Sequence, residues 1–89
     1  MRHELKTDAG YFEEIKQGRK TFEVRSEADR TFAAGDIVVL RETRHTGMEM
    51  LNAGAPLVYT GREFSFRAGY IMRGPVFGLS VGLVIISIA

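Results

Sequence analysis

Eighty-nine residues are enough for one domain, near the lower size at which an apolar core can stabilise a fold without help. The chain has no cysteine, which excludes disulfides and thiolate metal sites and is compatible with a reducing compartment. Twelve Lys and Arg against eleven Asp and Glu leave a net charge of +1, which excludes a polycation that holds nucleic acid by charge alone. We therefore expect a single domain over residues 1–89.

Neither end of the chain predicts a membrane segment. The N-terminal MRHELKTD lacks the apolar run of a secretory signal, and the apolar residues 83–89 are far fewer than the roughly 20 that span a bilayer. We expect a soluble cytoplasmic protein without a membrane partner.

A strand and then a short helix are predicted at the start of the chain. Residues 2–6 favour a strand with Leu5 and His3 turned inward, and Asp8 stands where a helix N-cap would accept a backbone N–H. The helix should end at Gly18, the residue type preferred just after a helix. Its apolar stripe is formed by Tyr11, Phe12 and Ile15.

From Lys20 onward the apolar period falls to two, which predicts a strand. Phe22 and Val24 share one face, which is predicted to be buried. The charged residues of this strand, Glu23 and Arg25, share the opposite face.

Three further strands are predicted. A glycine turn at residues 33–36 precedes an apolar strand at 37–40, residues 60–72 alternate in polarity, and 83–88 favour a strand in the middle of a sheet. Residues 45–57, HTGMEMLNAGAPL, have no sustained period and predict a long loop. The inward face of the alternating strand is expected to hold Phe64, Phe66, Ala68, Tyr70 and Met72.

These elements define the expected fold class. Five or six strands, one short N-terminal helix and glycine turns predict an α+β domain, arranged as a small mixed barrel that the helix plugs or flanks.

The elements also follow a recognisable order: a strand, a short helix, the motif GxKxxExR at residues 18–25, and a turn carrying Gly35 and Asp36 before an apolar strand. That order resembles the ASCH domain, a compact β-barrel of the PUA-like superfamily. The chain further resembles an uncharacterised ASCH-like family of phages and bacteria. The likeness covers nearly the whole chain except residues 45–57, in the segments HELK, YFEEIKQGRKTFEVR, FAAGDIVVLRE, YTGRE and FGLSVGLVIISI.

The resemblance implies two kinds of function. ASCH domains are regarded as RNA-binding modules because PUA domains bind RNA, which is an argument from fold. Other members resemble ribonucleases, or small bacterial amidohydrolases acting on acetylated cytidine. In the amidohydrolases the lysine of GRKT and a threonine three residues later are catalytic, together with a more distant glutamate. Lys20 matches that lysine, but Glu23 occupies the threonine position, and a carboxylate cannot replace a hydroxyl nucleophile in the same chemistry.

The motif residues form the candidate site. Glu23 and Arg25 lie two apart on a strand, so they leave the same face about 7 Å apart, and Lys20 lies at the helix-to-strand turn. The three can converge on one cleft, where the cations hold phosphate and the carboxylate accepts from a base amino group. The alternative is a structural ion pair on an exposed sheet face beside a solvated lysine.

Other candidate residues are weaker. His3 is expected either to line the cleft or to be a half-buried structural histidine, and Arg62 in YTGRE is a further ligand-binding candidate. Asp36 is expected to stabilise its turn through an Asx-type hydrogen bond. The two histidines are far apart and cysteine is absent, so we expect no metal site and no cofactor. The spacing of the aromatic residues assigns most of them to the core rather than to a base-stacking platform.

Three functions remain open from the sequence. The leading hypothesis is an RNA- or nucleotide-binding module built on Lys20, Glu23 and Arg25. The first alternative is a hydrolase of a modified nucleoside or a ribonuclease, with Lys20 as activating base or oxyanion partner and Glu23 as general acid or base. The second is a protein-interaction domain that docks a partner through the methionines of residues 45–57.

Overall fold

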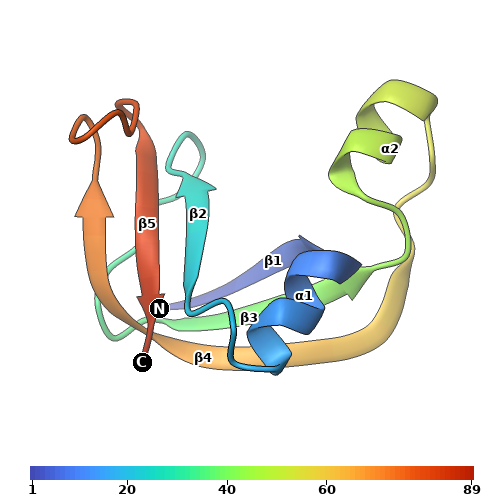
Figure 1. The fold of residues 1–89 in the computed structure, drawn as a ribbon, viewed down its shortest axis with the longest axis horizontal. Coiled ribbons are helices and arrows are strands. Elements are labelled where there is room, and N and C mark those ends of the chain that lie inside the picture. The colour runs from blue at the N-terminus through green and yellow to red at the C-terminus, as the bar shows by residue number, and fades with distance from the viewer.

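The computed structural model describes residues 1–89 as an α+β fold of five strands and two helices (Figure 1). This confirms the predicted α+β class and the order of the predicted strands. A second helix replaces part of the predicted loop. The elements are β1 (Arg2–Asp8), α1 (Ala9–Lys16), β2 (Phe22–Ser26), β3 (Ile37–Thr43), α2 (Gly47–Ala53), β4 (Tyr59–Arg73) and β5 (Leu83–Ile88).

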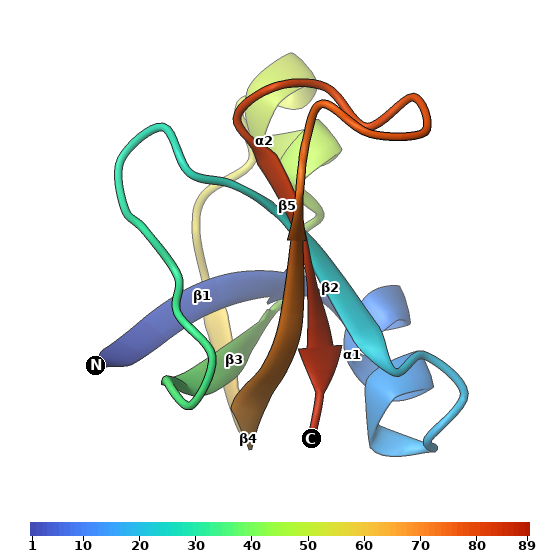
Figure 2. The ribbon, with the colours of Figure 1, turned by 90° about the vertical axis from the view of Figure 1, so that its left-hand side faces the viewer.

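All five strands belong to one sheet with the order β1-β3-β4-β5-β2. Only β1 and β3 are parallel, and every other pair is antiparallel. The long strand β4 pairs with β3 along its first part and with β5 along its last part, and it bends between the two (Figures 1 and 2). The sheet is therefore curled, with β1 and β2 left as its two edges rather than closed by backbone hydrogen bonds.

The core lies inside the curl of the sheet, with α1 packed over it. Strand β3 is buried on both faces because Val38, Val39 and Leu40 are all inaccessible to solvent. Each such aliphatic side chain contributes about 1.5–3 kcal/mol by leaving water. The core cluster comprises Leu5, Phe12, Ile15, Phe32, Val38, Leu40, Phe66, Ala68, Val84 and Ile86.

Tyr11 and Tyr70, both predicted for apolar faces, are exposed instead. Tyr11 is 59% exposed, so only Phe12 and Ile15 of the α1 stripe are buried. Tyr70 is 73% exposed because the register of β4 with β5 shifts between Ala68 and Ile71, which ends the simple alternation of the strand.

Asp36 fixes the start of β1. Its carboxylate accepts hydrogen bonds from the N-terminal ammonium at 3.0 Å and from the Ala33 N–H at 3.0 Å, and it lies 2.8 Å from Nε2 of the buried His3. The hydrogen bond from Ala33 confirms that Asp36 stabilises its turn, but the donor lies three residues before Asp36 rather than two residues after it, so the bond is not of the predicted Asx type. These contacts, that with His3 foremost, hold the pKa of Asp36 well below its usual range.

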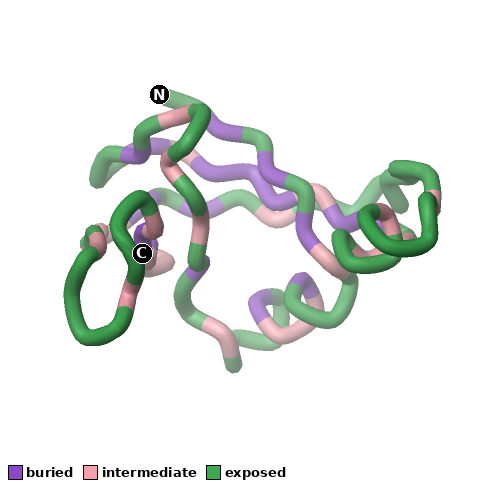
Figure 3. The backbone as a smooth tube through the Cα atoms, turned by 90° about the horizontal axis from the view of Figure 1, so that it is seen from above, coloured by how far each residue is buried: buried purple, intermediate pink, exposed green.

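The prediction of an irregular loop over residues 45–57 is wrong, because Gly47–Ala53 form helix α2. The missed signal is a capping box. The Thr46 hydroxyl accepts from the Glu49 N–H at 3.0 Å, and the Glu49 carboxylate accepts from the Thr46 N–H at 2.9 Å. A left-handed Gly54 ends the helix, which buries none of its residues and stands out as exposed in Figure 3.

Thr46→Ala should loosen α2 without unfolding the domain. Loss of the cap costs about 1 kcal/mol of helix stability, which corresponds to roughly fivefold less hydrogen-exchange protection of the α2 amides. The urea midpoint should stay unchanged because α2 buries no residue. Thr31→Ala, at an exposed loop threonine, serves as the control. A clear fall of the urea midpoint in Thr46→Ala would show that α2 unfolds together with the core.

Asp36→Asn should lower the free energy of unfolding at neutral pH and make that free energy depend less on pH in the acidic range. Because folding depresses the pKa of Asp36, its contribution is present above the unfolded pKa of about 4 and is lost as the pH falls below that value. Urea midpoints at about pH 6 and pH 3 should therefore differ less in the variant than in the wild type. Asp29→Asn, whose side chain is 81% exposed, is the control. An equal fall in both proteins would contradict the role assigned to Asp36.

Candidate functional site

Strand β2 buries its charged face and exposes its apolar one, so the prediction that Phe22 and Val24 are buried is wrong. Phe22 is 43% and Val24 46% exposed, whereas Glu23 is only 4% exposed. The pairing with β5 explains the inversion. Glu23 lies opposite the buried Ile86, and residues directly opposite each other in an antiparallel pair share a face of the sheet.

The three motif residues meet in one cluster. Lys20 Nζ lies 2.7 Å from Oε2 of Glu23, and Arg25 Nη2 lies 3.0 Å from Oε1. The carboxylate is therefore held by one cation on each oxygen. Because the Lys20 side chain is 16% exposed, it is not the solvated lysine of the alternative reading. The pairing compensates much of the cost of burying the Glu23 charge.

Arg25 also connects the two edges of the sheet. Its Nη2 donates to the Lys6 carbonyl at 3.1 Å and contacts the Thr7 hydroxyl at 3.3 Å, both on β1. Its Nε is buried without a hydrogen-bond partner in the protein. An unpaired buried donor costs about 1–3 kcal/mol, and no ligand reaches this nitrogen without movement of the groups around it.

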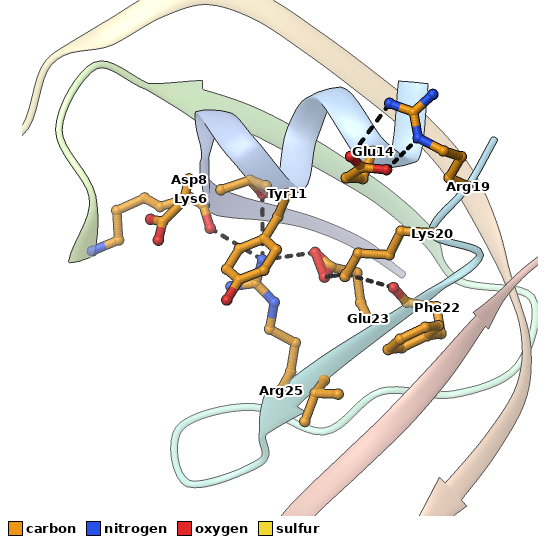
Figure 4. A pocket seen from close by; sticks show the side chains of 11 residues that line it. Lys6, Asp8, Tyr11, Glu14, Arg19, Lys20, Phe22, Glu23 and Arg25 are labelled. Atoms are coloured by element: carbon orange, nitrogen blue, oxygen red, sulfur yellow. Dashed lines mark hydrogen bonds and ion pairs between the residues drawn. The ribbon is translucent and has the colours of Figure 1, made fainter. Parts of the chain in front are cut away.

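The cluster lies at one side of an open cleft of about 750 Å³ between β1, α1 and β2 (Figure 4). This volume falls within the range of roughly 300–1,000 Å³ that is typical of small-molecule sites. We call it the Glu23 cleft. Its lining residues are Lys6, Thr7, Asp8, Tyr11, Glu14, Arg19, Lys20, Phe22, Glu23, Val24 and Arg25.

Aromatic rings stand on either side of the lysine. Lys20 Nζ lies 5.7 Å from the ring centre of Tyr11 and 5.0 Å from that of Phe22, and both rings are exposed. Exposed rings interleaved with basic side chains are the pattern that stacks bases. The prediction that places these aromatics in the core is therefore wrong for Tyr11 and Phe22.

Most charges of the cleft are already paired. Arg19 binds Glu14 at 2.6 Å, and this hydrogen bond lowers the pKa of Glu14. Asp8 has no capping hydrogen bond with α1 and instead accepts from the Gly47 N–H at 3.0 Å. Lys6 is the one cation of the cleft without a carboxylate partner. The cleft is thus a site of mixed charge rather than a broad cationic surface.

His3 and Arg62 lie outside the Glu23 cleft. His3 is buried against Phe32, with ring centres 4.5 Å apart, and its Nε2 contacts Asp36. Arg62 holds α1 against β4 by pairing with Glu13 at 2.9 Å, which raises the pKa of Arg62. The geometry therefore gives both residues structural contacts.

The cleft includes residues that sequence reasoning passed over. Thr7 is buried in its wall, and a signal for it existed, since Thr7 continues the alternation of His3 and Leu5 along β1. No local pattern indicated Tyr11, because its exposure depends on how α1 docks beside β2.

No group of three or more His, Asp or Glu side chains gathers where it could hold a metal ion. None of the helices has the length and apolar character needed to cross a membrane.

The fold and site define a small α+β domain with a polar cleft between the two edges of a curled sheet. A family model described as a domain of unknown function (DUF3850) matches residues 2–88, so the chain belongs to that family. No curated protein matches the chain.

Substitutions on β2 and β5 should reveal the inverted strand. Val24→Ala should cost about 0.5 kcal/mol or less because Val24 faces solvent. Val84→Ala, on the neighbouring strand, should cost about 2 kcal/mol because Val84 is fully buried. Urea unfolding of the two variants measures the difference. Equal losses of unfolding free energy would contradict the orientation of β2.

Proposed function

We propose that this chain is a binding module for RNA or nucleotides and that the Glu23 cleft is its site. The observation that carries the proposal is the buried Glu23 carboxylate, held between two cations beside two exposed aromatic rings. A nucleotide offers a matching set of groups: a flat ring, hydrogen-bond donors on its edge, and a phosphate.

Glu23 is the group that recognises the base edge. Each of its oxygens accepts one hydrogen bond from a cation and retains a second lone pair. An amino group of cytosine, adenine or guanine can donate to that lone pair. Tyr11 and Phe22 supply rings on which the base stacks, as in other single-strand binding sites.

Lys6 and Arg25 are the groups that hold phosphate. Lys6 has no carboxylate partner, and the side chain of Arg25 is 25% exposed where it lines the cleft. Because the other cations of the cleft are paired with carboxylates, the site suits one or two phosphates rather than a long backbone. This agrees with the net charge of +1, which does not favour sequence-blind binding.

The assignment to the ASCH domain and to a PUA-like barrel is part of the same proposal. Its support is the curled sheet with α1 beside it and the convergence of the motif residues Lys20, Glu23 and Arg25 in one cleft. A phage-like origin follows from that resemblance alone, and a cytoplasmic location stays a prediction from the sequence.

A hydrolase or ribonuclease is the second candidate. The observation in its favour is the short contact between Lys20 and Glu23 in an open cleft, an arrangement that can transfer protons. The Thr7 hydroxyl lies in the same cleft, next to Arg25. In this case the bound nucleoside or RNA would be converted, and Lys20→Gln would abolish turnover.

A protein partner is the third candidate, and α2 is the observation that favours it. The helix exposes Met48 by 67% and Leu51 by 83%, and it packs none of its residues into the core. Deleting α2 should then leave nucleotide binding intact.

Titration of the isotope-labelled protein with nucleosides, nucleotides and short RNA tests the leading proposal. Amide shifts should centre on Tyr11, Lys20, Glu23 and Arg25. Glu23→Gln should weaken binding of amino-bearing nucleotides about tenfold, because a charge-assisted hydrogen bond becomes a neutral one, while uridine nucleotides change less.

Glu63→Gln is the matched control, since Glu63 is an exposed glutamate paired with Arg41 outside the cleft. Chromatography of the same mixtures shows whether the ligand is converted, which would favour the hydrolase. Absence of shifts with every ligand, or shifts away from the cleft, would overturn the proposal.

A further inference from the structure

A second cleft adjoins the first. It has a volume of about 340 Å³ and lies between β1, the residues that follow β2, and the start of β4. The two clefts share Lys6 and Arg25, so they are contiguous at these residues. The lining of the second cleft is Glu4, Leu5, Lys6, Arg25, Ser26, Asp29, Arg30, Phe32, Leu57 and Tyr59.

We propose that the two clefts together bind a single-stranded oligonucleotide of at least two nucleotides, with one nucleoside in each cleft and the linking phosphate at their junction. This inference rests on the proposed function of the Glu23 cleft. It adds the length of the ligand, the position of the phosphate and a second nucleoside site.

The junction has the chemistry for one phosphodiester. Lys6 extends away from Glu23 and has no carboxylate partner (Figure 4). Arg25 lines both clefts, and its guanidinium-bearing side chain is 25% exposed. A phosphodiester carries one negative charge and acceptor oxygens, so it can take hydrogen bonds from both side chains at once.

The second cleft has the chemistry for a second base. Tyr59 is 36% exposed at its wall, and its ring is held by the Arg41 guanidinium, whose central carbon lies 3.6 Å from the ring centre. A ring held in this way is a fixed surface for stacking. Arg30, which also lines this cleft, adds a planar cation that can stack on a base.

A single strand fits these clefts better than a duplex does. A duplex presents two rows of phosphates and is held by several cations along its length. The junction offers two cations, and both clefts also contain carboxylates, including Glu23, Glu4 and Asp29. Recognition therefore depends on the bases and on one phosphate.

Affinities for cytidine, cytidine monophosphate, the dinucleoside monophosphate CpC, and tetracytidylate as RNA and as DNA test the inference. CpC should bind at least about tenfold more tightly than the mononucleotide, since it adds one stacked base. Tyr59→Leu and Lys6→Gln should each remove most of that ratio. Their matched controls, Tyr70→Leu and Lys16→Gln, change an exposed tyrosine and an exposed lysine outside both clefts and should keep it.

The outcomes separate this inference from the function on which it rests. Equal affinity for CpC and the mononucleotide, with shifts in the Glu23 cleft, would overturn the two-nucleotide inference and leave the proposed function standing. If the ratio of the affinities for CpC and the mononucleotide is unchanged in Tyr59→Leu and Lys6→Gln, the assignment of the second nucleoside site is overturned. No binding of any of these ligands would overturn both. Equal binding of the RNA and DNA tetramers would support recognition without the 2′-hydroxyl, and tighter RNA binding would add a sugar contact to the same site.

Discussion

The cleft depends on the hydrogen bonds of the Arg25 guanidinium. Strands β1 and β2 are the two edges of the sheet, and no backbone ladder joins them. One nitrogen of Arg25 reaches the Lys6 carbonyl and the Thr7 hydroxyl on β1 while it also holds Glu23 on its own strand. A side chain, rather than a strand pairing, therefore sets the separation of the two edges and leaves room for a cleft between them.

Strand β1 is fixed at both of its ends. Asp36 holds the first end through the N-terminal ammonium and the buried His3, and Arg25 holds the other end at Lys6 and Thr7. Asp8, where β1 ends, also accepts a hydrogen bond from the first residue of α2. An edge strand anchored in this way is a rigid wall, and rigid walls lose less entropy when a ligand binds. His3 thus supports the Glu23 cleft indirectly, because it helps to fix β1 but does not line the cleft.

The buried carboxylate distinguishes this cleft from a simple phosphate site. Without Glu23 the cleft would gather cations and attract any polyanion, whereas Glu23 occupies Lys20 and part of Arg25. A paired buried charge adds little net stability, but it positions its partners and demands a complementary donor from a ligand. The exposed Tyr11 and Phe22 add flat apolar surface beside that polar centre. Under the function proposed above, this combination selects a base rather than a phosphate backbone.

The sequence by itself determined the five strand positions, the helix α1, and the division of β2 into a charged and an apolar face. These follow from local periodicity, which is a property of neighbouring residues. A capping box at Thr46 also encoded α2, although the surrounding glycines favoured a loop. Only the tertiary structure decided which face of β2 turns inward, because that depends on its register with β5, about 60 residues away, where Ile86 lies opposite Glu23. Alternation specifies which side chains share a face, and long-range strand pairing specifies where that face points.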